Sequence, residues 1–216
     1  MLEAVQPRLA VSKRPSSAES RNNVQNQHNV AAEYGLCSFN YSHRVTMNGV
    51  YDLPFGHGRQ FLGGANGVMN ALVGGWQADT IFQAQTGPPG TLSVSTTTSN
   101  TGTGQYPDRI CDGNDGPKTV NAWFKTSCYA VPALYTFGNA GRNVMIAPGL
   151  WIWDVGVHKD FRLTEKLGLT FRNEFFNALN KANFGYPNTS IGGATAGTIR
   201  SAGPGRQIQF AMRLHW

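Results

Sequence analysis

The stretch YSHRVTMNGVYDL, residues 41–53, alternates between apolar and polar side chains with a period of two. Val50 is the one exception in the series. A period of two is typical of a β-strand with one apolar and one polar face. Strands in globular sheets usually have roughly five or six residues, whereas a tilted strand crosses a bilayer in about 9–11. The length therefore favours a membrane-crossing strand.

The same alternation recurs further along the chain. It resumes at Trp76 and stops before the turn sequence GPPG, residues 87–90. Three more alternating stretches, 151–161, 167–175 and 208–216, follow towards the carboxyl end. The sequence therefore predicts an all-β fold with about five long strands.

The connections between these strands alternate in length. Those at 54–75 and 162–166 are the shorter ones, and those at 88–149 and 178–205 are long. A structureless stretch as long as 88–149 is rare in a compact domain, so we expect it to be functional or mobile. Antiparallel strands joined by short turns and long extracellular loops are typical of an outer-membrane β-barrel. Lipid offers no hydrogen-bond partners to the backbone, so only helices and closed barrels, which pair their own backbone groups, span it.

The composition agrees with this class and excludes others. Charged residues make up 14% of the chain, against roughly 25% in soluble domains. No run approaches the length of a transmembrane helix, and an aromatic content of 11% is too high for simple disorder. The net charge of +6 is spread along the chain without a run of three Lys or Arg, so we expect no nucleic-acid partner.

No motif for catalysis or metal binding is present. The sequence Phe55-Gly56-His57-Gly58 lacks the spacing of a nucleotide-binding loop and suits a turn. Asp154, His158 and Asp160 occupy alternate positions of one predicted strand, which indicates one polar face of a sheet. We therefore expect no enzyme activity, no cofactor and no metal.

The three cysteines leave two alternatives open. Cys111 and Cys128 lie within one polar segment, whereas Cys37 is remote from both. A Cys111–Cys128 disulfide would close a loop in an oxidising compartment. Three free thiols fit the sequence equally well.

Five segments occur in an order that is similar to one family. They are QNQHNVAAEYGLCSFNYSHRVTMNGVYDLPFGHGRQFLGG (25–64), GGWQADTIFQAQTGPP (74–89), GNAGRNVMIAPGLWIWDVGVHKDFRL (138–163), LTFRNEFFNALNKANFGYP (169–187) and GRQIQFAMRLHW (205–216). The most specific element is Phe176-Asn177-Ala178-Leu179-Asn180. Together the segments resemble the carboxyl-terminal part of a TonB-dependent outer-membrane receptor of the Oar-like β-barrel type.

The resemblance implies a Gram-negative outer-membrane location and a part in energised substrate passage. Receptors of this type have about 22 strands around a plug, so 216 residues would form a partial barrel. Residues 1–40 would be an incomplete amino-terminal segment and residues 41–216 the carboxyl-terminal barrel portion. Implied partners are outer-membrane lipid, the plug and amino-terminal barrel portion, and the TonB system acting through that plug. The last strand also resembles a signal read by the barrel-assembly machinery, carried by Phe210, Met212, Leu214 and Trp216.

The two faces of the strands would then meet different surroundings. Side chains of the polar face would line the lumen and contact ligand or plug: Arg44, Asn48, Gln77, Asp79, Gln83, Asp154, Arg172 and Glu174. Aromatic side chains of the other face would meet lipid and form interfacial girdles: Trp76, Trp151, Trp153, Phe171 and Phe175. On this assignment, Leu169→Arg would cost about 2–4 kcal/mol if Leu169 lies near the bilayer midplane.

A soluble or surface-bound β-sandwich is the alternative, because its strands alternate for the same reason. Such a module would bind carbohydrate, for example, through exposed Trp and Tyr side chains, and would take no part in transport.

Overall fold

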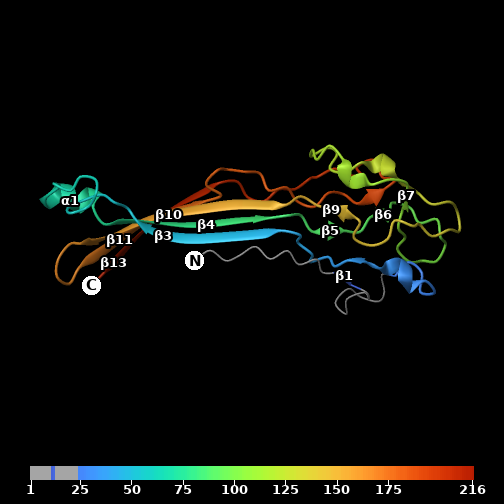
Figure 1. Ribbon diagram of the computed structural model, residues 1–216, viewed down its shortest axis with the longest axis horizontal. Coiled ribbons are helices and arrows are strands. Elements are labelled where there is room, and N and C mark those ends of the chain that lie inside the picture. Colours follow the sequence, from blue (N-terminus) through green and yellow to red (C-terminus); the bar gives the residue numbers. More distant parts are fainter. Residues whose placement is uncertain (1–10, 13–23) are drawn as a thin grey trace.

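The computed structural model describes residues 11–12 and 24–216 of the chain. It is an elongated molecule built around one antiparallel sheet (Figure 1). The sheet has five strands in the order β13-β11-β10-β4-β3. They are β3 (Arg44–Asp52), β4 (Trp76–Gln85), β10 (Leu150–Arg162), β11 (Gly168–Phe176) and β13 (Gln207–His215).

The predicted all-β fold with five long strands is confirmed, and the strand bounds differ from those expected by a few residues. The largest difference lies before β3, which begins at Arg44 and not at Tyr41. Its neighbour β4 ends at Gln85, and the backbone of His43 pairs with Thr86 through two further hydrogen bonds. From Gly87 onward the chain after β4 turns away from the sheet, so Tyr41 has no strand opposite it to pair with.

The register of the sheet separates two faces. Residues directly opposite each other on paired strands share a face. On one face, Val45 lies opposite Ala84, and Ala84 lies opposite Trp151. On the other face, Gln77 lies opposite His158, and His158 lies opposite Arg172. The first is the apolar face and the second the polar face. Among the described residues, the edge strands β3 and β13 have a neighbour on one side only.

One end of the sheet carries two connections. The turn after β10 closes with a hydrogen bond from the Leu163 N–H to the Leu167 carbonyl, 2.9 Å. The longer connection, 53–75, contains the helix α1 (Gly67–Val73) and lies at the far left of Figure 1. Gly56 has φ 111° and an added Cβ would lie 2.6 Å from Gly74 Cα, so glycine is required where this connection folds back on itself.

The other end carries a small folded body, at the right of Figure 1, formed by residues 11–12, 24–43, 86–149 and 177–206. We call it the loop domain. Its regular structure is limited to short strand pairs and single 3₁₀ turns. The strands are β1 (Val11–Ser12) with β2 (Gly35–Leu36), β5 (Pro89–Gly90) with β9 (Met145–Ile146), β6 (Ser93–Val94) with β12 (Ser190–Ile191), and β7 (Asp108–Arg109) with β8 (Tyr129–Ala130). The 3₁₀ turns are η2 (Val30–Glu33), η3 (Gly113–Asp115) and η4 (Thr126–Cys128).

The loop domain contains the buried hydrophobic cluster of the described chain. Its members come from widely separated segments: Leu92, Tyr106, Phe124, Cys128, Tyr129, Ala140, Met145, Ala147 and Ile191. The connection 88–149 is therefore a packed structure and not a structureless loop. A Cys111–Cys128 disulfide closes part of it, and Cys37 is a free thiol.

Residues 24–36 are also fixed within this domain, although the sequence predicted only a polar loop. Glu33 is buried and accepts hydrogen bonds from the Tyr106 hydroxyl, 2.5 Å, and the Gln25 N–H, 3.2 Å. The Gln25 side chain in turn donates to the Gly138 carbonyl, 2.7 Å. Buried polar side chains need such partners, so these two residues attach the segment to the domain.

Within residues 11–12 and 24–216, no helix combines the length and apolar character needed to cross a membrane.

Candidate functional site

The polar face of the sheet carries a connected group of side chains towards the end that bears α1. The His158 ring lies between two acceptors, with Nδ1 3.1 Å from Asp79 Oδ1 and Nε2 2.6 Å from Gln77 Oε1. The Gln77 amide donates onward to Asp52 Oδ1, 2.8 Å. Three strands thus contribute to one hydrogen-bonded row across the sheet.

A glycine makes room for this row. Gly156 lies directly opposite both Asp79 and Glu174. A Cβ built on Gly156 would lie 2.4 Å from an Asp79 carboxylate oxygen, so any other residue would displace that carboxylate. Beyond it, the Arg172 guanidinium lies 3.8 Å from Glu174 Oε1 on the same face.

The eight polar residues singled out in the sequence share this face but do not form one cluster. Gln77, Asp79, Arg172 and Glu174 surround His158, which the sequence assigned to the same face without a special role. Arg44, Asn48 and Gln83 lie closer to the loop domain. Arg44 lies opposite Gln85, whose Oε1 accepts a hydrogen bond from the Gln83 amide at 3.4 Å, and Asn48 lies opposite Ile81.

Asp154 has a different environment from the other seven. Its Oδ1 accepts a hydrogen bond from the Asn177 N–H, 2.8 Å, where the chain leaves β11. Asn177 has φ 50° and its side chain binds the backbone of Lys181 in both directions. The Phe176–Asn180 element thus shapes the turn into the loop domain, and Asp154 holds that turn in place.

Asp160 is the remaining acidic residue of the predicted strand. Its Oδ1 accepts a hydrogen bond from the Thr170 hydroxyl at 2.5 Å. Asp154, His158 and Asp160 therefore each have a separate partner. No group of three or more His, Cys, Asp or Glu side chains suited to a metal ion occurs among residues 11–12 and 24–216.

The apolar face carries the predicted aromatic residues at two levels. Near α1, the Trp76 ring packs edge-on against Phe161 and Phe171, with centroids 6.4 and 5.9 Å apart. Near the loop domain, Phe82 packs edge-on against Trp151 at 5.2 Å. Trp153 and Phe175 share the face between these levels, and the Trp153 indole donates to the Thr80 hydroxyl at 2.6 Å. Phe210, Met212 and Leu214 of β13 continue the same face, and Trp216 follows as a highly exposed residue.

One charged residue on this apolar face was missed in the sequence. Lys159 lies directly opposite Trp76 and is 4% exposed. Its ammonium group donates to the carbonyls of Ala71 and Gly74 and lies 4.8 Å from the Phe161 ring centroid. Its position in an otherwise apolar series was the available signal.

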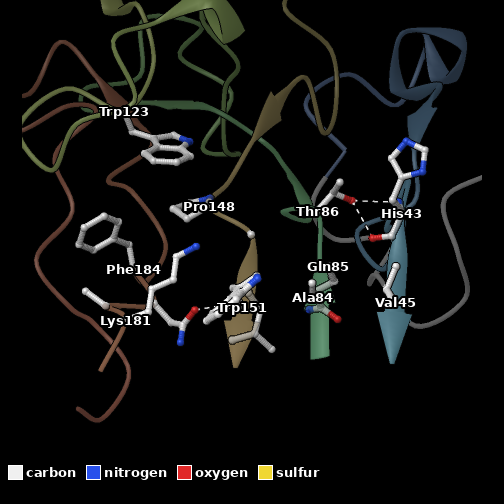
Figure 2. A pocket seen from close by; sticks show the side chains of 14 residues that line it. His43, Val45, Ala84, Gln85, Thr86, Trp123, Pro148, Trp151, Lys181 and Phe184 are labelled. Carbon is white, nitrogen blue, oxygen red and sulfur yellow. Dashed lines mark hydrogen bonds between the residues drawn. The ribbon is translucent and has the colours of Figure 1, made fainter. Parts of the chain in front are cut away.

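A cleft of about 480 Å³ opens where the apolar face meets the loop domain (Figure 2). Val45, Ala84 and Trp151 form the sheet side, and Trp123 and Phe184 belong to the loop-domain side. The Lys181 ammonium lies 4.7 Å from the Trp151 ring centroid. The cleft is mainly apolar with one cation, which suits an apolar ligand that carries an anionic group.

The shifted pKa values of the loop domain reflect its packing. The Asn114 N–H donates to Asp112 and holds the pKa of that carboxyl below its usual value. Burial lowers the pKa of Lys118 and raises the pKa values of Tyr129 and Tyr186. None of these four residues lines the cleft in Figure 2, so they mark no reactive centre there.

Comparison with known proteins agrees with the geometry. No curated protein and no solved structure matches the chain. A family model described as an outer membrane beta barrel domain matches residues 9–209, which include the four strands β3, β4, β10 and β11 and the start of β13. The chain therefore belongs to the outer-membrane β-barrel domain family and to the outer membrane of Gram-negative bacteria.

Proposed function

We propose that this chain is the carboxyl-terminal barrel portion of a TonB-dependent outer-membrane transporter. The observation that carries the proposal is the two-faced sheet, in which charged and amide side chains share one face and aromatic side chains share the other. A barrel wall between a polar lumen and lipid requires this division. Among the described residues, β3 and β13 each have one open edge, where a partial barrel would accept further strands.

The loop domain is the substrate-capturing surface in this proposal. Outer-membrane barrels have short periplasmic turns and long extracellular loops. The loop domain therefore lies outside the cell, and the 163–167 turn and α1 lie at the periplasmic side. Its packed core gives captured substrate a shaped surface, because close-packed interiors hold side chains in fixed positions.

The polar face is the wall along which substrate passes or against which a plug rests. Arg44, Asn48 and Gln83 would meet substrate first, since they lie nearest the loop domain. The group around His158 follows further in. Paired charges such as Arg172 and Glu174 keep this wall polar without a large net field.

The requirement for TonB rests on the resemblance of the five segments quoted above. Outer-membrane lipid, the plug with the amino-terminal barrel portion, and the barrel-assembly machinery are the further partners of this proposal.

The test has two stages. In the first, membranes of the natural host are extracted with carbonate and then with detergent, and the chain is expected only in the detergent extract, with a strong β signal by circular dichroism. In the second, the host lacking this protein is grown on a panel of siderophores, glycans and peptides beside a host lacking TonB. Every growth defect of the first strain should also appear in the second.

A growth defect that the TonB-deficient strain does not share would overturn the transport proposal while leaving the barrel intact. Recovery of the chain as a soluble folded monomer would contradict both and support the carbohydrate-binding alternative.

A further inference from the structure

Helix α1 exposes its apolar side chains and turns its polar side chain inward, which is the reverse of a helix on the surface of a soluble protein. Its apolar side chains point away from the molecule, with Val68 77% exposed and Leu72 59% exposed. Its one polar side chain, Asn70, points inward, and Asn70 Oδ1 accepts a hydrogen bond from the His57 N–H at 2.7 Å. A helix in water places its apolar stripe against the protein, so this arrangement calls for apolar surroundings.

The carboxyl-terminal turn of α1 needs little water. The last carbonyls of a helix lack partners within it. Here the Ala71 and Gly74 carbonyls accept from the Lys159 ammonium, and the Leu72 carbonyl accepts from the Trp76 indole at 2.8 Å. A helix end removed from water requires such side-chain donors for its carbonyl groups.

The position of α1 joins it to the apolar face of the sheet. Lys159 and Trp76, which hold it, lie opposite each other on that face. The exposed Phe61 and Leu62 extend the apolar surface along the same connection. The surface is therefore continuous with the one that the barrel presents to lipid.

The charges around α1 fit phospholipid headgroups. Residues 54–75 contain Arg59 and no Asp or Glu. A cleft of about 450 Å³ between this connection and β10 is lined by Arg59 and His57. Its one acidic residue, Asp160, is hydrogen-bonded to Thr170. Basic side chains beside an apolar helix are typical of segments that lie in a membrane interface.

We propose that α1 lies in the periplasmic leaflet of the outer membrane as an interfacial helix, with Val68, Met69 and Leu72 among the acyl chains and Arg59 at the phosphates. Lys159 and Trp76 attach it to the barrel wall, so the protein holds the membrane with a helix as well as with strands. The inference rests on the barrel orientation given under the proposed function.

The test measures the lipid contact of single labelled positions. The full chain carrying Cys37→Ser, which removes its free thiol, receives Val68→Cys, Met69→Cys, Met47→Cys or Leu134→Cys and a small environment-sensitive fluorophore. Met47 lies on the apolar face of β3 and reports barrel insertion; Leu134 is 71% exposed in the loop domain and reports water. Each protein is reconstituted into vesicles of phosphatidylethanolamine and phosphatidylglycerol, with and without brominated acyl chains.

We expect brominated lipid to quench labels at 68 and 69 to within about twofold of the label at 47, because an interfacial helix lies about 5–10 Å into the headgroup boundary. The label at 134 should be quenched by aqueous iodide only. Iodide quenching of 68 and 69 equal to that of 134, with 47 still quenched by lipid, would overturn the helix proposal alone. Absence of lipid quenching at 47 would overturn the barrel placement on which it rests.

Discussion

The apolar face supports a quantitative prediction about a single arginine. Along β10, Trp151 and Lys159 mark the two aromatic levels, since Lys159 lies opposite Trp76. With a rise of about 3.4 Å per residue and a strand tilt of about 40°, these levels are about 21 Å apart, close to the apolar band of about 25 Å. Val155 lies midway between them and therefore near the bilayer midplane.

Val155→Arg should therefore cost about 2–4 kcal/mol of folding free energy, the range for arginine at the midplane of a barrel. Leu169 lies opposite Phe161, six residues from Val155 along the strand direction and hence about 16 Å from the midplane. The cost of about 2–4 kcal/mol for Leu169→Arg applied only if Leu169 lies near the midplane, and this geometry places it near the edge of the apolar band. We therefore expect Leu169→Arg to cost only about 0–1 kcal/mol.

The assay is equilibrium urea unfolding of the assembled barrel in phospholipid vesicles, followed by tryptophan fluorescence and analysed by linear extrapolation. Gln83→Arg is the matched control, because it places the same charge on the polar face and should change stability by no more than about 0.5 kcal/mol. Equal costs for Val155→Arg and Leu169→Arg would refute the depth assignment. A Gln83→Arg variant as unstable as Val155→Arg would refute the assignment of faces.

Three further predictions concern buried groups. Replacing Cys111 and Cys128 by Ser removes a link across 17 residues and should destabilise the loop domain by about 3 kcal/mol, seen as faster proteolysis of the intact protein; unchanged proteolysis would contradict this. Burial raises the pKa values of Tyr129 and Tyr186, so the folded domain binds these protons more tightly than the unfolded chain. Its stability should therefore fall as the pH rises above about 10. Unfolding followed by near-ultraviolet circular dichroism should show a smaller loss of stability when both Tyr129 and Tyr186 are replaced by Phe. Asn173 Oδ1 is buried on the apolar face without a hydrogen-bond partner, so Asn173→Leu should stabilise the barrel by about 1–3 kcal/mol in the urea assay; a loss of stability would show that the amide has a necessary role.

The strands could be predicted because lipid on one side and polar surroundings on the other impose a strict alternation on each of them. Turn residues such as Gly87 and Pro88 also marked the strand ends. The shared face of Gln77, Asp79 and Arg172 followed from the same alternation. That His158 contacts both Gln77 and Asp79 could not be predicted, because it depends on the register between β4 and β10.

The loop domain could not be predicted for a different reason. Its core side chains, such as Leu92, Phe124 and Met145, lie in short segments that show no regular apolar period. They meet only through the tertiary fold. Helix α1 could not be predicted because a segment of seven residues is too short to show a helical period. Its stabilising contacts come from Lys159 and Trp76, which lie outside it.

The parallel pairing of β6 with β12 fixes an order of events during biogenesis. Val94 of the first long connection pairs with Ile191 of the last one, 97 positions later in the chain. Leu92 and Phe124 can therefore complete their packing only after residues near 191 have reached the same side of the membrane. Contacts between such distant segments are slow to form, because closing a long loop costs entropy. The core of the loop domain thus cannot be complete before β12 has reached it, and β12 follows β3, β4, β10 and β11 in the chain.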